Sequence, residues 1–207
     1  MKTFWDERYR SEAFIYGEAP NAFFASKIKL LAPGKLLLPA EGEGRNAVFA
    51  AKLGWDVSAF DWSEEGRKKA ERLAEKEKVT IEYLVSDLEQ VVYKKESFDL
   101  LGLFFAHFPE KVRHGYHQKL SAFVKPGGKL IVEGFAKAHI ELSRANPKAG
   151  GPKDEGMLFS LDIIREDFPE FQWELLEEVT DFLNEGTFHV GESALIRAVG
   201  TKVDRDN

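Results

Sequence analysis

The sequence contains no cysteine, so it can form no disulfide and offers no thiolate for a metal site or a covalent intermediate. It also lacks any apolar run near the roughly 18 residues that a membrane-spanning helix needs. Residues 1–10 are charged and aromatic, with no apolar stretch behind them of the kind found in signal peptides. We therefore expect a cytoplasmic protein that makes no contact with a membrane.

An excess of basic residues is absent as well. The chain has 29 Lys and Arg against 35 Asp and Glu, and its net charge of −6 opposes approach to a phosphate backbone. The Lys and Arg residues of 64–78 alternate with glutamates, as is typical of a solvated helix. Nucleic acid is not an expected partner, and the sequence does not indicate the oligomeric state.

The 207 residues are 43% hydrophobic and 31% charged, and no linker-like stretch divides them. This composition predicts one globular domain over residues 1–207, with a helical cap over residues 1–34. Apolar runs of strand type alternate with segments of helical spacing or helix-capping signals. The strand-type runs are 36–39, 55–60, 79–85, 97–105 and 129–135, and the helical segments are 47–53, 63–78 and 109–124.

Such alternation predicts a parallel sheet with right-handed crossovers, which places ligands at the carboxyl ends of the strands. The last third differs, because a helix near 160–167 precedes two strands, 171–179 and 189–200, that a short connection joins. Strands joined in this way run antiparallel. We therefore expect an α/β, Rossmann-like, seven-stranded and mostly parallel sheet with an antiparallel C-terminal strand and helices on both faces.

A glycine turn follows the first predicted strand. The residues from Gly42 to Ala47 fit the pattern G-x-G-x-x-G/A, in which glycines let a ligand approach the backbone where a helix begins. Asp61 ends the next strand, nineteen residues beyond Gly42, where a carboxylate can accept hydrogen bonds from ribose hydroxyls. Together these features predict a site for an adenosine-type cofactor.

A nicotinamide cofactor would satisfy the same two features, so an NAD(P)-dependent oxidoreductase is one alternative. Asp87 distinguishes the cases, because it ends the third strand at the same rim, where it can bond an adenine amino group. The sequence shows no second catalytic domain for hydride transfer. These observations favour S-adenosylmethionine as the cofactor.

The ordered motifs resemble those of class I S-adenosylmethionine-dependent methyltransferases over essentially the whole chain. The set comprises residues 36–44, Asp61-Trp62-Ser63, Ser86-Asp87-Leu88, Phe98-Asp99-Leu100 and Lys125-Pro126-Gly127-Gly128. Within that class the chain resembles most the small tellurite-resistance and thiopurine methyltransferase-like group. This narrower resemblance rests on residues 5–9, Tyr16-Gly17, Pro20-Asn21, Pro39 and Gly44-Arg45-Asn46.

The resemblance implies an enzyme that transfers a methyl group to a small-molecule acceptor by direct displacement. It also implies roles around the cofactor: Glu41, Gly42 and Gly44 at the methionine moiety, Asp61 at the ribose, Trp62 at the adenine face, Asp87 and Leu88 at the adenine edge, and Phe104 and Phe105 near the methyl group. In that family the N-terminal segment folds over the cofactor, so the resemblance implies that Trp5, Tyr9 and Tyr16 help to close the site; the alternative is that they only pack as aromatic side chains.

One position departs from the family pattern. The acid that many relatives carry inside the first strand is replaced by Leu38, and Glu41 follows three residues later. Glu41 either takes over part of that duty or only faces solvent. The departure leaves a second alternative, a protein that binds S-adenosylmethionine without catalysis.

The histidines suggest one catalytic group and no metal. His107 follows the fourth strand, next to the expected methyl position, and is the candidate general base, since imidazole accepts protons near neutral pH. The alternative is a loop histidine that bonds to backbone. His114 and His117 share a predicted helix face but lack a third ligand, so we expect them to be solvent-exposed.

Overall fold

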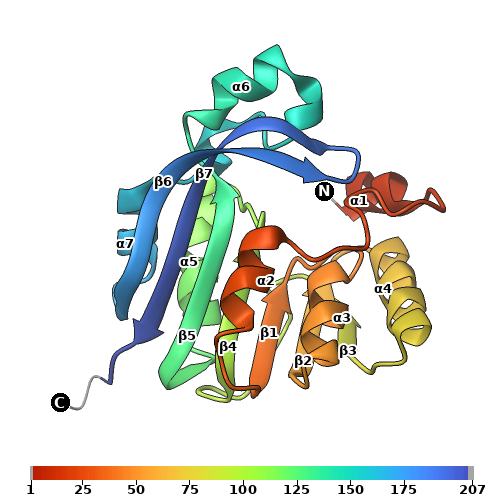
Figure 1. Ribbon diagram of the computed structural model, residues 1–207. Helices are drawn as coiled ribbons and strands as arrows, with labels where there is room; N and C mark the ends of the chain where they lie inside the picture. Colours follow the sequence, from red (N-terminus) through yellow and green to blue (C-terminus); the bar gives the residue numbers. More distant parts are fainter. Residues whose placement is uncertain (1, 205–207) are drawn as a thin grey trace.

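The strands form one mixed sheet. In the computed structural model, which describes residues 2–204, the sheet has seven strands in the order β3-β2-β1-β4-β5-β7-β6 (Figure 1). The parallel strands are β1 (Lys35–Pro39), β2 (Asp56–Asp61), β3 (Glu82–Val85), β4 (Phe98–Phe104) and β5 (Val124–Phe135). Strand β7 (His189–Lys202) runs antiparallel between β5 and β6 (Phe171–Glu185). The predicted fold class is confirmed.

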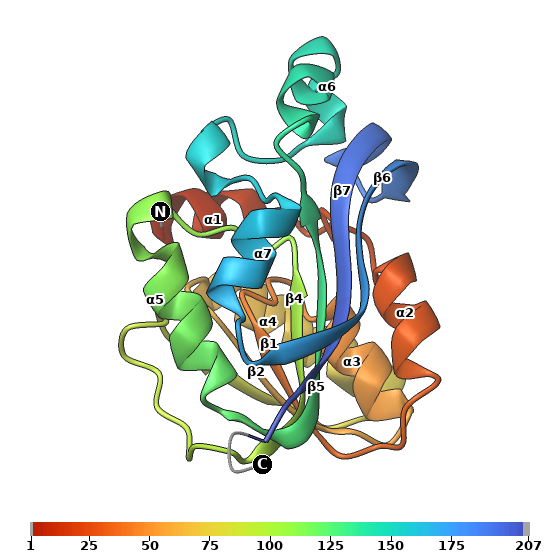
Figure 2. The same ribbon diagram turned by 90° about the vertical axis from the view of Figure 1, so that its left-hand side faces the viewer.

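Helices cover both faces of the sheet, as the view in Figure 2 shows. Helices α2 (Ala22–Ile28) and α3 (Arg45–Lys52) lie on one face, and α5 (Glu110–Ser121) and α7 (Leu161–Asp167) lie on the other. Side chains of a strand alternate between faces, so the apolar run of β1 has to be buried on both sides. Leu36 and Leu38 pack with α2 and α3, whereas Leu37 packs toward α5.

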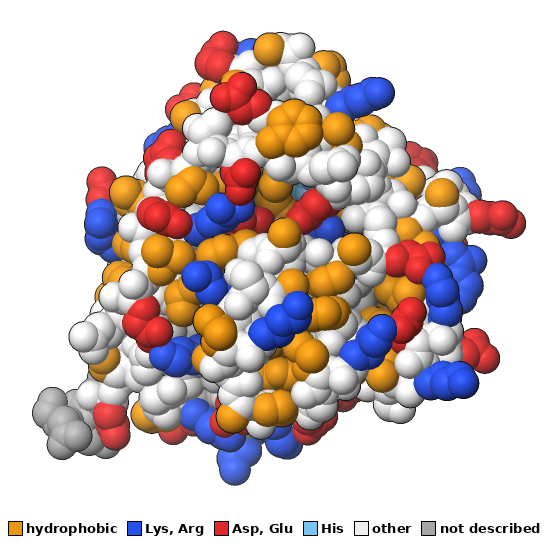
Figure 3. Space-filling model, viewed as in Figure 1, with side chains coloured by type: hydrophobic (Ala, Val, Ile, Leu, Met, Phe, Trp, Pro, Cys, Tyr) orange, Lys and Arg blue, Asp and Glu red, His pale blue; other side chains and the backbone are white. Residues whose placement is uncertain are grey.

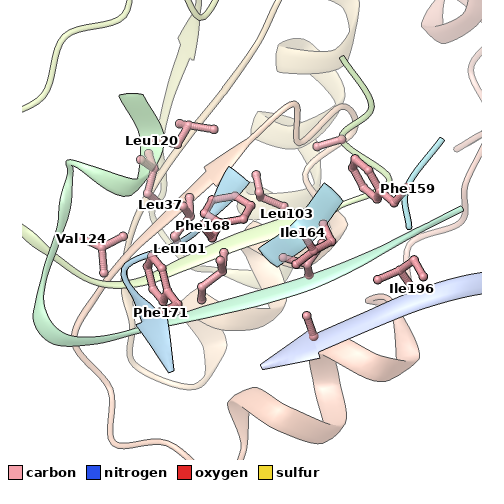
Figure 4. Packing of buried hydrophobic residues seen from close by; sticks show 14 of the residues in the cluster. Leu37, Leu101, Leu103, Leu120, Val124, Phe159, Ile164, Phe168, Phe171 and Ile196 are labelled. Atoms are coloured by element: carbon pink, nitrogen blue, oxygen red, sulfur yellow. The ribbon is translucent and has the colours of Figure 1, made fainter. Parts of the chain in front are cut away.

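The larger core cluster lies between the sheet and the pair α5 and α7 (Figure 4). Leu101 and Leu103 of β4 are at most 1% exposed and share this cluster with Leu120 of α5. Ile164 and Phe168 add the contribution of α7 and the residue that follows it. Burial of such side chains stabilises the fold by about 1.5–3 kcal/mol each, so these two helices hold β4 and β5 firmly.

The remaining helices lie near the sheet edges and at the carboxyl ends of the strands. They are α1 (Lys2–Tyr9), α4 (Glu64–Glu77), α6 (His139–Ala145) and the short 3-10 helices η1 (Pro147–Ala149) and η2 (Glu155–Met157). Helix α4 begins at Ser63, whose hydroxyl accepts a hydrogen bond from the N–H of Gly66 at 3.0 Å. Every helix within residues 2–204 is too short or too polar to span a bilayer.

Several boundaries differ from the sequence prediction: β6 runs to Glu185 instead of residue 179, β3 starts only at Glu82, and the region between α5 and β5 is arranged differently. Helix α5 ends at Ser121, and β5 starts at Val124, so the Lys125-Pro126-Gly127-Gly128 segment lies inside the strand's bounds. Val124 pairs with Phe98, and pairing resumes only at Lys129 opposite Leu100, with a register shift between them. The turn residues therefore form an irregularity within the strand. Helix α6 was not predicted.

A buried ionic cluster joins α5 to α7. Asp167 accepts hydrogen bonds from Arg113 Nε at 2.9 Å and from the ring Nδ1 of His117 at 2.8 Å, and its other oxygen contacts His114. Burial raises the pKa of Asp167, but His117, His114 and Arg113 outweigh burial and hold the pKa at about 2. His114 is exposed as expected, whereas the expectation for His117 is wrong, because its ring is fully buried against Asp167 and Phe168.

We predict that this cluster makes the fold sensitive to acid. A carboxylate whose pKa is depressed on folding contributes stability above its unfolded pKa and loses it as the pH falls through the folded pKa. As the pH falls from about 5 to about 2, protonation of Asp167 should thus lower the free energy of unfolding by roughly 2 kcal/mol. His117, whose pKa burial lowers, acts in the same direction. Urea unfolding at several pH values measures this.

The Asp167→Asn variant should lose roughly 3 kcal/mol at neutral pH, because Arg113 stays buried without its partner, and its remaining stability should fall less steeply in acid. Asp162→Asn on the same helix is the matched control, since Asp162 forms an exposed pair with Arg165. That change should cost under about 0.5 kcal/mol. Equal losses in the two variants would contradict the assignment.

Candidate functional site

The candidate site lies where the chain order reverses in the sheet. Strands β1 and β4 are neighbours, and the chain continues from β1 toward β2 but from β4 toward β5, on opposite sides. Open α/β sheets bind ligands at the carboxyl ends of such a strand pair. Ala40 and Phe105, which directly follow β1 and β4, have left-handed φ angles of 52° and 54°. Such backbone strain persists at functional sites at a cost of order 1–3 kcal/mol per residue.

The two glycines of the turn leave space for close approaches. Gly44 begins α3 at φ +84°, and a Cβ there would lie 2.4 Å from Cβ of Ala70 in α4. Gly42 has φ +63°, and a Cβ there would lie 2.5 Å from the hydroxyl oxygen of Tyr9. Gly42 thus lets the N-terminal segment contact the turn, and Gly44 lets α3 and α4 pack together.

Asp61 ties the glycine turn to the start of α4. Its Oδ2 accepts a hydrogen bond from the N–H of Gly42 at 3.1 Å, and its Oδ1 accepts one from the N–H of Ser63 at 2.8 Å. Burial raises the pKa of this carboxyl to about 6. A carboxylate held between two turns at this edge has the position expected for a ribose-binding group.

Glu41 does not face solvent. Its Oε1 accepts hydrogen bonds from the N–H groups of Asn46 and Ala47, both at 2.8 Å, at the start of α3. Burial raises its pKa to about 7, and the positive end of the helix favours its charged form. The solvent-facing alternative is therefore wrong, whereas a role for Glu41 at the methionine moiety stays a prediction.

Glu43, between the two glycines, fastens the N-terminal segment to the turn. Its carboxylate oxygens accept hydrogen bonds from the N–H groups of Ile15 and Tyr16, each at 3.0 Å. Lys69 of α4 donates to Glu43 at 2.7 Å and to the carbonyl of Ala13 at 2.6 Å. Sequence reasoning missed Glu43, because the motif treats its position as variable. The only available signal was a carboxylate between two turn glycines.

The aromatic residues of the N-terminal segment lie against this turn. Tyr9 is buried and stacks on Trp5 with ring centroids 5.5 Å apart. The hydroxyl of Tyr16 accepts a hydrogen bond from Arg8 at 3.0 Å. Helix α1 is attached to α4 through Asp6, which accepts a hydrogen bond from the hydroxyl of Ser63 at 2.7 Å.

Trp62, Asp87 and Leu88 lie at the neighbouring strand ends. Trp62 is half-buried directly after Asp61, and the N–H of Ser86 donates to the carbonyl of Asp61 at 2.9 Å. Asp87 is half-buried and accepts a hydrogen bond from the N–H of Gln90 at 2.8 Å. The side chain of Leu88 is buried in the core, so any contact of Leu88 with a ligand would come from its backbone.

The two phenylalanines after β4 point to different places. Phe104 packs in the core against Phe24 of α2, with ring centroids 4.7 Å apart. Phe105 packs at the rim against Phe135, at 4.8 Å, and His189, at 4.2 Å. The structure thus separates two residues that sequence reasoning placed together, and only the ring of Phe105 is at the crevice.

His107 has both ring nitrogens engaged with the backbone. Its Nδ1 lies 2.8 Å from the carbonyl oxygen of Met157, and its Nε2 accepts a hydrogen bond from the N–H of Phe135 at 3.0 Å. Burial lowers its pKa to about 3. This arrangement matches the backbone-bonding alternative and holds the loop after β4 against β5, so the catalytic role of His107 stays a prediction.

A buried polar network that sequence reasoning also missed centres on Asn21. The N–H of Asn21 donates to Oδ1 of Asn46 at 2.9 Å, and its side-chain amide donates to Glu133 at 2.6 Å and Glu185 at 3.2 Å. Asn21 and Asn46, 25 residues apart, both belong to the motifs of the narrower family resemblance. Among residues 2–204, no group of three or more His, Asp or Glu side chains is arranged to hold a metal ion.

Comparison with known proteins agrees with this geometry. Residues 39–128 match the family described as a methyltransferase domain. The matched region begins at the last residue of β1 and runs through the glycine turn, Asp61 and Asp87 to Gly128. No curated protein matches the chain in sequence.

Solved structures share the fold over nearly the whole chain. One is a protein from work on the conversion of a disulfide bond into a thioacetal group during echinomycin biosynthesis. It has a TM-score of 0.74 at 19% identity, and the match covers 98% of this chain and 92% of that chain. TehB from Haemophilus influenzae has a TM-score of 0.70 at 15% identity, covering 97% and 66%. Magnesium protoporphyrin IX methyltransferase from Synechocystis, with bound SAH, has 0.68 at 18%, covering 96% and 98%.

At these identities the structural likeness concerns the fold. The family match covers residues 39–128, which is less than half of the chain, and supports an enzyme of the methyltransferase class with the fold of the S-adenosylmethionine-dependent enzymes. S-adenosylmethionine is the cofactor of this class. The residues present fit that cofactor, because Asp61 offers a buried carboxylate at the carboxyl end of β2, beside the glycine turn.

We predict that a methyl group added at Gly42 will disturb both the fold and the cofactor site. Gly42→Ala should cost about 2 kcal/mol of unfolding free energy, since alanine is strained at this positive φ and meets the hydroxyl of Tyr9. Adding Tyr9→Phe should recover part of the loss, because it removes the atom in closest contact. Denaturant unfolding gives the free energies, and calorimetry gives the affinity for S-adenosylhomocysteine.

Gly115→Ala is the control for Gly42→Ala. Gly115 lies within α5 with no other group near its absent Cβ, so alanine should stabilise the protein by roughly 0.5–1 kcal/mol. A Gly42→Ala variant as stable as the wild type, with unchanged affinity, would show that the turn is not under the constraint described.

Proposed function

We propose that the chain transfers the methyl group of S-adenosylmethionine to a small-molecule acceptor by direct displacement. The cover over the glycine turn supports a small acceptor. Glu43 holds the backbone of Ile15 and Tyr16 on this turn, and the N–H of Thr187, between β6 and β7, donates to the carbonyl of Ile15 at 2.6 Å. A site that its own chain covers from two sides admits a small molecule more readily than a protein or a nucleic acid.

The proposed cofactor contacts follow the rim of the sheet. When bound, S-adenosylmethionine supplies a methyl group that is already activated by its sulfonium charge. Glu41, Gly42 and Gly44 would hold the methionine moiety, and Asp61 the ribose hydroxyls. Trp62, Asp87 and the backbone of Leu88 would surround the adenine, with Phe104 behind the crevice. Tyr16 and Phe105 would exclude water from the reacting groups.

The narrower assignment, to the tellurite-resistance and thiopurine methyltransferase-like group, is part of the same proposal. The hydrogen bond between Asn21 and Asn46 and the N-terminal segment folded onto the turn support it. The shared fold with TehB from Haemophilus influenzae is a further support. A cytoplasmic location is part of the proposal as well, and the lack of cysteine, which suits a reducing compartment, supports it.

We expect cofactor affinity to depend on pH through Asp61. Its carboxylate accepts hydrogen bonds from ribose hydroxyls only when ionised, and burial raises its pKa to about 6. Affinity for S-adenosylhomocysteine should therefore rise as the pH increases through about 6, which calorimetry can measure. Asp61→Asn should weaken binding by roughly 10- to 100-fold, since a hydrogen bond to a charged group contributes about 1.5–3 kcal/mol, and should abolish this step.

The Glu41→Gln variant shows which of the two buried carboxyls causes the change in affinity. The pKa of Glu41 is about 7, and we expect this variant to keep the change near pH 6 that belongs to Asp61. A wild-type protein that fails to bind S-adenosylhomocysteine at any pH would overturn the proposed function. Binding with no dependence on pH would overturn only the role of Asp61.

The size of the acceptor can be tested directly. Purified protein and S-adenosylmethionine with a labelled methyl group are incubated with a cell extract, which is then divided by dialysis. We expect the label to appear in a dialysable product that chromatography separates from S-adenosylmethionine, because the N-terminal segment covers the glycine turn. The control omits the protein. Label that enters only the protein fraction would contradict a small-molecule acceptor and leave methyl transfer itself established.

A further inference from the structure

His189, the first residue of β7, lies at the crevice in a setting that the cofactor contacts do not explain. Its ring centroid is 4.6 Å from that of Tyr16, 4.2 Å from that of Phe105 and 5.3 Å from that of Phe135. The residue is only 6% exposed, yet Nδ1 of its ring has no hydrogen-bond partner among the described residues. Tyr16 and Phe105 are the two aromatic residues that we place beside the reacting groups.

Glu185 holds a carboxylate beside this free nitrogen. Glu185 and His189 face each other across the hairpin of β6 and β7, and Oε2 of Glu185 lies 4.0 Å from Nδ1 of His189. The carboxylate is fixed from other sides, because Arg45 donates to Oε2 at 2.7 Å and the N–H of Ala22 donates to Oε1 at 3.2 Å. These bonds fix the carboxylate of Glu185 in place, while its distance of 4.0 Å to Nδ1 of His189 is longer than a hydrogen bond.

This arrangement has the parts of a general base with an orienting carboxylate. Such pairs are often loose without ligands and tighten in the reacting complex. The face shown in Figure 3 is hollowed below α6, with acidic and basic side chains around the hollow. His107, in contrast, has both ring nitrogens bonded to backbone groups.

We propose that His189 is the base that removes a proton from the methyl acceptor, that Glu185 is its positioning residue, and that the acceptor is an uncharged hydroxyl or thiol compound with a flat apolar body. This inference rests on the proposed function. It assigns a role to two residues outside the expected cofactor contacts and names the chemical class of the acceptor.

In the proposed step, methyl transfer and proton transfer take place together. The acceptor's oxygen or sulfur forms a bond to the methyl carbon, while the bond between that carbon and the sulfonium sulfur breaks and its electron pair stays on sulfur. The proton of the acceptor moves to Nε2 of His189. Nδ1–H of the resulting imidazolium then donates to Glu185, whose negative charge stabilises the positive ring.

The charges around His189 favour an uncharged acceptor. Arg45 is already paired with Glu185, and Arg8 donates to the hydroxyl of Tyr16 with its guanidinium 4.4 Å from the ring of Phe188. Because both guanidinium groups already have partners, neither is available to neutralise a negatively charged oxygen of an acceptor. The rings of Tyr16 and Phe105 instead offer flat apolar contact.

The titratable groups facing His189 are Glu185 of β6, Arg45 of α3, Tyr16 of the N-terminal segment, His139 of α6 and His107 after β4. Burial lowers the pKa of His189 to about 4, so the ring is neutral near pH 7 and able to accept a proton. Burial alone would raise the pKa of Glu185, but His189 and Arg45 beside it hold the pKa at about 2.

The test compares acceptors that need a base with acceptors that do not. At slightly alkaline pH, phenol and benzyl mercaptan stay protonated, whereas 4-nitrophenol and 4-nitrothiophenol are ionised. The wild type should methylate at least one protonated probe. Comparison of phenol with benzyl mercaptan shows whether the protein accepts a hydroxyl or a thiol. His189→Ala should slow methylation of that probe on the order of 100-fold and that of its ionised analogue less than about 10-fold.

Imidazole added to His189→Ala should restore methylation of the protonated probe, which a merely structural loss would not allow. Glu185→Gln should slow the protonated probe more than the ionised one, and Glu185→Asp should recover part of the rate. His139→Ala is the matched control, since His139 also stacks on Phe135, with ring centroids 4.1 Å apart, and imidazole should not affect that variant.

Calorimetry with S-adenosylhomocysteine separates this inference from the proposed function. His189→Ala should bind that ligand within about threefold of the wild type. If the wild type binds it but methylates neither protonated probe, the acceptor class is overturned. If both probe types slow equally and imidazole rescues neither, the assignment of the base is overturned. A wild type that does not bind the ligand overturns the proposed function itself.

Discussion

The buried carboxylate of Glu43 is the contact on which the arrangement of the site depends. It joins the glycine turn, the N-terminal segment and, through Lys69, helix α4. Both charges of the pair are buried, which is costly unless each is also hydrogen-bonded. Here the two N–H groups of residues 15 and 16 and the carbonyl of Ala13 supply those bonds. If the N-terminal segment left the turn, the buried charges of Glu43 and Lys69 would therefore lose hydrogen-bond partners or become exposed.

A second polar centre, at Asn21, connects the same segment to the far side of the crevice. Its contacts reach α3 through Asn46, β5 through Glu133 and β6 through Glu185. Glu133 is itself paired with Arg197 of β7. Two buried networks thus clamp one segment between the parallel half of the sheet and its antiparallel hairpin, and the crevice lies between them.

The position of these networks gives the carboxyl edge of the sheet two chemically different sides. The side near β1 and β2 has backbone N–H groups and the carboxylates of Glu41 and Asp61, which suit a polar cofactor. The side near β4, β5 and β7 has the rings of Phe105 and Phe135 and the imidazole of His189. A polar ligand and an apolar partner can therefore meet at the strained residues that follow β1 and β4.

The sequence alone determined the order of strands and helices, the glycine turn, the carboxylate at the end of β2 and, from these, the fold class. These features depend on local patterns: apolar runs, helix caps and glycines within a few residues of each other. It did not reveal Glu43, Asn21 or the pair of Glu185 and His189, nor that both nitrogens of His107 are bonded to backbone. Those contacts join residues that lie from 25 to 164 positions apart, or depend on hairpin packing, so only the tertiary structure could decide which polar group meets which.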